Sequence, residues 1–188
     1  MRIISGTLKN KKLIFQKNFN TRPLKDSVRE NIFNILFHSK NIEVNLKNSI
    51  VLDLYAGTGS FGFECVSRGS SKVVFVEKNA EAIKILNTNT KNLKCENKII
   101  LFQKSVKDFY PKSSKNKFDI IFFDPPYENK EFIEIIKLIQ KERTLLKKKH
   151  LIIIHREFKT EDNIDQYLNI LEKRIYGRSK IYFGKFIL

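Results

Sequence analysis

The sequence predicts an α/β protein in which a mostly parallel, seven-stranded sheet carries helices on both faces. From residue 49 onward, apolar runs rich in Ile, Val and Phe alternate with segments of helical periodicity. The apolar runs do not alternate with polar residues, which indicates strands that are buried on both faces. A glycine-rich turn follows the first of these strands and opens a helix, as in Rossmann-like folds.

The elements follow from these runs in chain order. Parallel strands are expected at residues 50–52, 72–76, 99–102, 118–123 and 151–154. Helices are expected to end near Ser67 and to span residues 80–89, 131–140 and 162–171. Two final strands are expected within residues 173–188, around a turn at 177–179.

Composition favours a nucleic-acid partner. The 188 residues suit one structural unit, and 36 Lys and Arg against 20 Asp and Glu give a net charge of +16. Such an excess attracts polyanions, although a basic proteome would also produce it. The two cysteines are too few to indicate a disulfide framework. The sequence shows neither a signal peptide nor an apolar run of membrane-spanning length. We therefore expect a cytoplasmic protein with no membrane partner.

Residues 1–48 are expected to form an N-terminal extension, a β-hairpin followed by a helix. Residues 2–6 and 12–15 could be two strands around a polar turn, and Asp26 is a candidate N-cap of a helix through Phe37. The basic side chains of Lys9, Lys11 and Lys12 could hold phosphates and thereby contact RNA. Residues 49–188 form the second region of the chain, which contains the predicted sheet.

The glycine-rich turn indicates a nucleotide-like ligand. Gly57, Gly59 and Gly62 have the G-x-G-x-x-G spacing that lets backbone approach a ligand closely. This motif alone is weak, because it also occurs as a plain tight turn.

Two strand-end acids favour S-adenosylmethionine over NAD. Asp53 precedes the loop, where a carboxylate could meet the amino group of an amino-acid moiety but would repel a pyrophosphate. Glu77 ends the next strand, at the spacing where an acid bonds ribose hydroxyls. After the third strand, Ser105 stands where an acid often contacts adenine, and we interpret Asp108 as a helix-start charge.

The segment Asp124-Pro125-Pro126-Tyr127 is the most specific signal in the chain. A strand that ends in this pattern, downstream of such a loop, is the signature of amino-methyltransferases. The Asp124 carboxylate and Pro125 carbonyl can accept from the two N–H bonds of an exocyclic amine, and Tyr127 offers a stacking face. No metal is needed, because the sulfonium is already activated.

The identity of the base follows from donor and acceptor patterns. A carboxylate such as Asp124 accepts only, whereas Asn can also donate. Guanine presents two neighbouring donors and adenine presents a donor beside an acceptor, so Asp suits guanine. Adenine-N6 methylation of DNA or RNA stays open as an alternative.

With these residues, the chain resembles the bacterial 16S (small-subunit) ribosomal RNA guanine-N2 methyltransferases over nearly its whole length. The likeness includes the segment from Asp124 to Tyr127. It extends to residues 2–6, 21–36, 67–69 and 75–79 and to the final hairpin around 176–177. The cofactor loop from Asp53 to Gly59, which includes Tyr55 and Ala56, matches as well.

The resemblance implies a Rossmann-like class I methyltransferase. It would be a monomer that binds S-adenosylmethionine and no metal and acts on ribosomal RNA or an assembling small subunit. It also implies that Arg22, held extended by Pro23, borders the substrate. Ser105 and the segment His155-Arg156 depart from the family pattern, and we expect His155 to be structural or peripheral, because this mechanism needs no titrating imidazole. A NAD-dependent oxidoreductase and a non-catalytic ribosome-assembly factor are the remaining alternatives.

Overall fold

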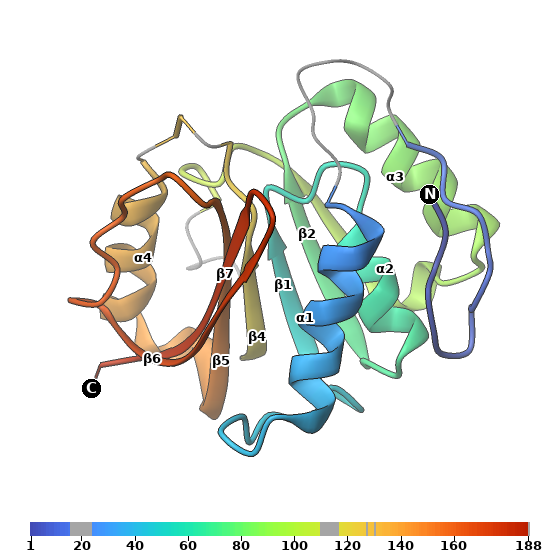
Figure 1. Cartoon of the computed structure of the whole chain (residues 1–188). Helices are drawn as coiled ribbons and strands as arrows, with labels where there is room; N and C mark the ends of the chain where they lie inside the picture. The colour runs from blue at the N-terminus through green and yellow to red at the C-terminus, as the bar shows by residue number, and fades with distance from the viewer. Residues whose placement is uncertain (16–23, 110–116, 127, 130, 188) are drawn as a thin grey trace.

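A single twisted sheet organises the chain (Figure 1). The computed structural model describes residues 1–15, 24–109, 117–126, 128–129 and 131–187. The sheet has seven strands in the order β3-β2-β1-β4-β5-β7-β6, so the expected α/β fold is confirmed. Its strands are β1 Ile50–Leu54, β2 Lys72–Glu77, β3 Ile99–Gln103, β4 Phe118–Phe123, β5 Leu146–Glu157, β6 Leu168–Tyr176 and β7 Ser179–Phe186.

Helices cover both faces of this sheet, as expected (Figure 1). One face packs against α1 Asp26–His38, α2 Ser60–Ser67 and α3 Ala80–Asn92. The other face packs against α4 Phe132–Lys141 and the loop that follows β3. Two short 3₁₀ helices, Glu96–Lys98 and Arg143–Leu145, precede β3 and β5. The strands β1, β2 and β4 are therefore buried on both sides, which explains their uninterrupted apolar runs, whereas β3 at the edge of the sheet is only partly buried.

The strand order reverses between β1 and β4. From β1 the chain adds β2 and β3 on one side, then crosses back to place β4 on the other side, and all of these pairs are parallel. Ligands of open α/β sheets bind beyond the carboxyl ends of the strands at such a reversal. The topology thus directs attention to the residues that follow Leu54, Glu77 and Phe123.

The N-terminal segment is not the two-stranded hairpin that the sequence predicts. Its strand pairing is a single antiparallel bridge between Arg2 and Lys12. The backbone N–H groups of Ile4 and Ser5 donate instead to the Glu64 carboxylate of α2, at 2.8 and 3.0 Å. Ile3 N–H still donates to the Lys11 carbonyl and Leu13 N–H to the Met1 carbonyl, each at 3.0 Å. The two ends of the segment therefore meet at this bridge, while the part between them is held against α2.

The first helix begins one residue earlier than predicted. Asp26 is its first residue rather than its N-cap, a position held by Lys25 without a side-chain cap. The Asp26 carboxylate accepts instead from the buried guanidinium of Arg29, at 3.0 Å. An acid in the first turn still stabilises the helix, through its dipole.

The helix predicted over residues 162–171 is wrong. Residues 165–167 form a turn, and β6 begins at Leu168 and pairs with β7 in antiparallel fashion. Leu168 and Ile170 face one core cluster while Leu171 packs on the other, so the side chains alternate as in a strand. A register shift between Ile170 and Glu172 interrupts the pairing. Because of this irregularity, the apolar residues of the strand have a spacing that resembles that of a helix.

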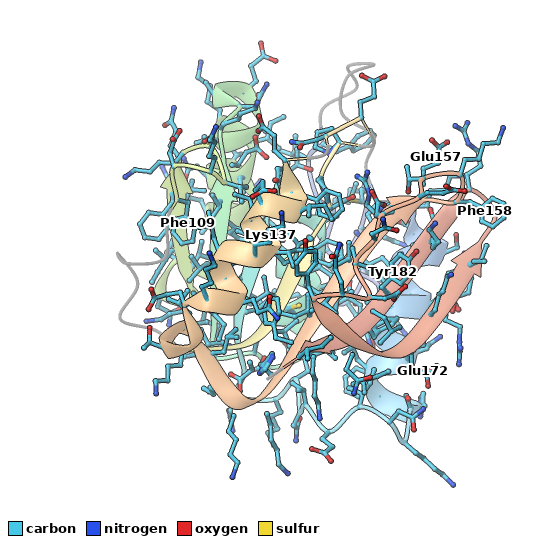
Figure 2. All side chains as sticks on the ribbon, turned by 90° about the vertical axis from the view of Figure 1, so that its left-hand side faces the viewer. Phe109, Lys137, Glu157, Phe158, Glu172 and Tyr182 are labelled. Atoms are coloured by element: carbon cyan, nitrogen blue, oxygen red, sulfur yellow. The ribbon has the colours of Figure 1, made fainter. Side chains whose placement is uncertain are left out.

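The C-terminal strands contact the segment that follows α1. Glu172 of β6, labelled in Figure 2, accepts from the Ser39 hydroxyl just after α1, at 2.9 Å. β7 pairs with β5 over six residue pairs, from Ile152–Gly184 to Glu157–Ser179. The β6–β7 hairpin therefore completes the sheet beside β5, next to the strand reversal.

Candidate active site

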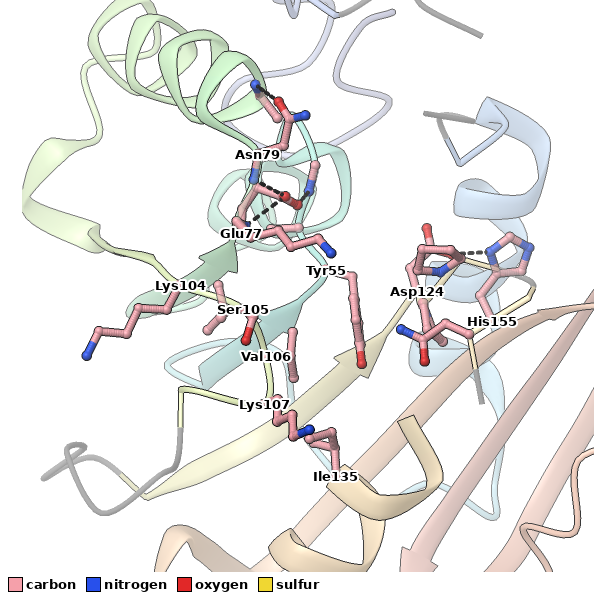
Figure 3. Close-up of a pocket in the computed structure, with 18 of the residues that line it drawn as sticks. Tyr55, Glu77, Asn79, Lys104, Ser105, Val106, Lys107, Asp124, Ile135 and His155 are labelled. Atoms are coloured by element: carbon pink, nitrogen blue, oxygen red, sulfur yellow. Dashed lines mark hydrogen bonds and ion pairs between the residues drawn. The ribbon is translucent and has the colours of Figure 1, made fainter. Parts of the chain in front are cut away.

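A cavity of about 530 Å³ opens at the carboxyl ends of the parallel strands (Figure 3). Its wall comes from the segments that follow β1, β2, β3 and β4, together with one residue of β5 and part of α4. The residues that line it include Tyr55, Ala56, Gly57, Glu77, Ser105, Asp124, Pro125 and His155. The pocket thus lies where the strand order predicts a ligand.

Glu77 forms one end of this pocket. Its carboxylate accepts from three backbone N–H groups, those of Gly57, Lys78 and Asn79, each at 2.8 Å. Asn79 also caps α3 by accepting from Ala82 N–H at 2.9 Å. A carboxylate held this firmly can accept further bonds from ligand hydroxyls without losing its orientation.

The glycine loop is shaped by close packing beneath it. Gly59 has a φ of 84° and precedes α2, a conformation that favours glycine. A Cβ on Gly62 would lie 2.2 Å from the ring of Phe75, so only glycine lets α2 approach β2 this closely. Gly59 shapes the loop and does not line the pocket itself.

Asp53 lies under the loop and not in the pocket wall. It is 1% exposed, and its Oδ2 accepts from Gly62 N–H at 3.0 Å. Burial raises the pKa of the Asp53 carboxyl, the Gly62 N–H opposes this shift, and the charges of Asp124 and Glu77 add to it. Three acids therefore share the carboxyl edge of neighbouring strands, where they favour a positively charged ligand.

Tyr55 stands between the two ends of the pocket in the view of Figure 3. Its backbone φ of 60° is unusual for a residue with a side chain. Burial raises the pKa of the Tyr55 hydroxyl to about 12, with the charge of Glu131 in the same direction and Arg156 opposing it. The hydroxyl is therefore neutral at physiological pH and can serve as a donor or acceptor.

Ser105 lies in the pocket wall after β3. Its hydroxyl donates to the Asp108 carboxylate at 2.6 Å and accepts from the Asp108 N–H at 3.1 Å. A hydroxyl whose proton is committed to Asp108 presents acceptor capacity to the pocket. Asp108 lies in a turn over residues 106–108, and residues 110–116 lie outside the part of the chain that the structure describes, so its interpretation as a helix-start charge stays a prediction.

Asp124 and His155 form the other end of the pocket. The Oδ1 atom of Asp124 lies 2.8 Å from Nδ1 of His155, and Nε2 of His155 lies 3.0 Å from the Ser179 hydroxyl. His155 is 5% exposed and Ser179 is 7% exposed. His155 was expected to be structural or peripheral: its burial and hydrogen bonds agree with a structural role, and its place in the pocket wall shows that it is not peripheral.

Arg156 holds the proline turn that follows Asp124. Its Nη1 donates to the Pro126 carbonyl at 3.1 Å, and its other nitrogens donate to both oxygens of Asp162, at 2.8 and 3.2 Å. The guanidinium also stacks over the ring of Phe132, 4.4 Å from its centroid. A charge buried in this way is stable because it is paired and hydrogen-bonded.

The structure thus brings together part of the predicted site. Lys11 and Lys12 are exposed on the N-terminal segment and do not line the pocket. Arg22 and Tyr127 lie outside the described residues. Sequence reasoning missed His155, Arg156 and Ser179. For His155 a signal was available, because it follows the apolar run 151–154 just as Asp124 follows the run 118–123, and Phe123 pairs with Ile154 in parallel register.

Two further features concern the described residues only. They contain no cluster of three or more His, Cys, Asp and Glu side chains arranged to hold a metal ion. None of their helices combines the length and apolar character that crossing a membrane requires.

The family described as "Conserved hypothetical protein 95" matches residues 1–185. The chain belongs to this family. A relative named ribosomal RNA small subunit methyltransferase D, from Buchnera aphidicola, is 33% identical over 96% of this chain and 90% of its own length. The family resemblance expected from the sequence is therefore confirmed.

Solved structures agree with this assignment. The Haemophilus influenzae protein HI0767, named provisionally as a methylase, superposes with a TM-score of 0.74 at 28% identity, covering 100% of this chain and 98% of its own. The Escherichia coli protein yhhF has a TM-score of 0.82 at 23% identity, covering 99% of this chain and 97% of its own, which supports the fold. The predicted Rossmann-like methyltransferase architecture is thus confirmed.

Proposed function

We propose that this protein transfers a methyl group from S-adenosylmethionine to the exocyclic N2 amine of a guanine in small-subunit ribosomal RNA. The observation that carries the proposal is one pocket with Glu77 at one end and the Asp124-Pro125 turn at the other. A ligand with a ribose could be held at the first end, and an amine could be held at the second.

The residues at the first end suit the cofactor. The Glu77 carboxylate, oriented by three N–H groups, can accept from the two vicinal ribose hydroxyls. Ser105, with its proton directed to Asp108, can accept from the adenine amine. Tyr55, Ala56 and Gly57 would line the remainder, and Asp53 would hold the loop from beneath through the bond that it accepts from Gly62 N–H. The bound cofactor supplies an electrophilic methyl group on a sulfonium, which the acidic surroundings would stabilise.

The residues at the second end suit an amine nucleophile. The lone pair of an exocyclic base amine is conjugated into the ring, so the amine must be oriented and polarised before it reacts. The Asp124 carboxylate and Pro125 carbonyl would accept from its N–H bonds, and catalysis would consist of alignment and electrostatics. Because a carboxylate accepts only, Asp124 also suits the neighbouring N1–H of guanine.

Ribosomal RNA as the substrate is supported by relatives and by charge. The Buchnera relative is named for small-subunit ribosomal RNA, and the net charge of +16 favours a polyanion. Exposed Lys11 and Lys12 would contact phosphates. Arg22 and Tyr127 would border and stack on the extruded base, as the family resemblance implies.

Methyl transfer is tested with purified protein, small-subunit ribosomal RNA and cofactor labelled in its methyl group. We expect label in the RNA with the wild-type chain. A folded wild-type protein that binds cofactor but transfers no label to free RNA or to the small subunit would contradict the proposal.

A further inference from the structure

Three side chains form a hydrogen-bonded chain that leads from the C-terminal hairpin to Asp124. Ser179 lies at the start of β7, His155 lies in β5, and Asp124 directly follows β4. The two links measure 3.0 Å, from Ser179 Oγ to His155 Nε2, and 2.8 Å, from His155 Nδ1 to Asp124 Oδ1. The dashed contact between His155 and Asp124 is visible in Figure 3.

Sheet register fixes the positions of these three residues. Phe123 pairs with Ile154 in parallel register, so Asp124, just after β4, and His155, within β5, lie side by side. Glu157 pairs with Ser179 in antiparallel register, which makes Ser179 a diagonal neighbour of His155. The chain of contacts therefore depends on strand pairing and not on a loop.

Donor and acceptor chemistry gives the chain a direction. A carboxylate only accepts, so the Nδ1 atom of His155 must donate to Asp124. In a neutral imidazole the Nε2 atom then accepts, and the Ser179 hydroxyl donates to it. Ser179 thereby selects the tautomer that donates to Asp124.

We infer that His155 is a positioning residue for Asp124, and that Ser179 acts on Asp124 through His155. The inference rests on the proposed function, in which Asp124 receives the base amine. His155 holds Oδ1, which fixes the plane of the carboxylate and leaves Oδ2 directed to the amine. A carboxylate without this donor would rotate, and the reacting nitrogen would be less well aligned.

Replacements at position 155 separate the hydrogen bond from simple packing. Asn can present its amide N–H near the position of Nδ1, whereas Gln reaches toward Nε2 and Leu only fills space. We expect His155→Leu and His155→Gln to lower kcat by at least about tenfold, and His155→Asn to recover most of it. Binding of S-adenosylhomocysteine should stay within about twofold of wild type in all three, because Glu77 is untouched.

A second histidine of the same strand provides the matched control. His150 is also buried, with Nδ1 3.1 Å from the Lys147 carbonyl and Nε2 accepting from Phe186 N–H at 3.2 Å. It does not line the pocket. His150→Asn should therefore change thermal stability without changing kcat.

Nuclear magnetic resonance of the imidazole nitrogens tests the chain independently of activity. At a pH where His155 is neutral, we expect the Nδ1-protonated tautomer, and Ser179→Ala should shift the tautomer balance toward Nε2–H. Observation of the Nε2-protonated tautomer in the wild-type chain would overturn the inference.

Two kinetic outcomes would also overturn it. One is an active wild-type enzyme whose His155→Leu variant keeps its kcat. The other is an equal loss of kcat in the Asn and Leu variants, which would mean that packing alone matters. If the wild-type chain transfers no methyl group at all, the proposed function fails, and the tautomer measurement still decides whether His155 donates to Asp124.

Discussion

The two ends of the pocket are built in different ways. At the proposed cofactor end, backbone N–H groups hold the Glu77 carboxylate, and two of the three donors are its immediate successors in the chain. At the proposed amine end, side chains hold the segment from Asp124 to Pro126. His155 bonds to Asp124, 31 residues away, and Arg156 bonds to the Pro126 carbonyl, 30 residues away.

This difference predicts different responses to mutation. A carboxylate held by backbone stays oriented when neighbouring side chains change, so only its own replacement matters. A carboxylate held by a side chain depends on that side chain and on the strand pairing that supports it. The amine end should therefore be the part that point mutations disturb most easily without loss of cofactor binding.

The largest effect is expected at Asp124. Asp124→Asn should lower turnover at least about a hundredfold, comparable to the loss of a well-placed transition-state hydrogen bond. Cofactor affinity should remain near the wild-type value, because Asp124 lies at the other end of the pocket. Calorimetric titration with S-adenosylhomocysteine and a methyl-transfer assay measure the two quantities. Equal losses in both would show that the two ends are not separable.

Glu77 should show the opposite pattern. Glu77→Ala should weaken cofactor binding about tenfold or more, because a charged hydrogen-bond partner is worth roughly 1.5–3 kcal/mol. At saturating cofactor, turnover should fall much less than in Asp124→Asn. Unchanged binding in a folded Glu77→Ala protein would refute the assignment of the ribose to this end.

A smaller effect is expected at the basic N-terminal segment. Lys12→Ala should reduce the slope of log RNA affinity against log salt by about one unit per lost phosphate contact. Neither cofactor affinity nor turnover should change, because Lys12 lies outside the pocket wall. The check is RNA binding across a salt series, beside Lys159→Ala, an exposed lysine near the end of β5, as a comparison. An RNA affinity that hardly varies with salt would exclude the electrostatic contribution.

The smallest effect concerns Asp53. Burial raises the pKa of the Asp53 carboxyl above its unfolded value, so the contribution of this group to stability is fully present below the unfolded pKa and is lost as pH rises through the folded pKa. At pH 7, burial of this carboxyl therefore costs stability. Asp53→Asn, which keeps an acceptor for Gly62 N–H, should raise the melting temperature at pH 7 by roughly 2–4 °C, a change of about 1 kcal/mol.

This stability difference has a defined pH dependence. It should shrink as the pH approaches 4, because wild-type Asp53 is then neutral as well. Thermal melts of both proteins across this range provide the measurement. A variant that is less stable than wild type at pH 7 would show that the carboxylate charge itself stabilises the fold.

The two ends also differed in how well the sequence predicted them. Glu77 and Asp124 can be predicted because each lies at the end of an apolar run, and the glycine spacing marks the loop between β1 and α2. His155 also follows an apolar run, but the mechanism needs no imidazole, so chemistry gives no reason to expect it in the site. Ser179 reaches the site only through antiparallel pairing of β7 with β5, which no local pattern indicates.

Errors in the fold have the same origin in distant contacts. Residues 162–171 have apolar spacing that suits a helix, yet pairing of β6 with β7 imposes a strand with an irregular register. The N-terminal segment has strand-like composition, yet the Glu64 carboxylate accepts from the N–H groups of Ile4 and Ser5, and the strand pairing there is limited to one bridge. Local propensity is a weak guide where a distant partner satisfies the backbone.

The most direct test of the account is the identity of the methylated nucleoside. Small-subunit ribosomal RNA is incubated with the protein and cofactor, digested, and analysed by mass spectrometry, with Asp124→Asn in parallel. The account predicts N2-methylguanosine with the wild-type chain and at least about a hundredfold less with the variant. N6-methyladenosine as the product would contradict the assignment of guanine to the Asp124 end of the pocket.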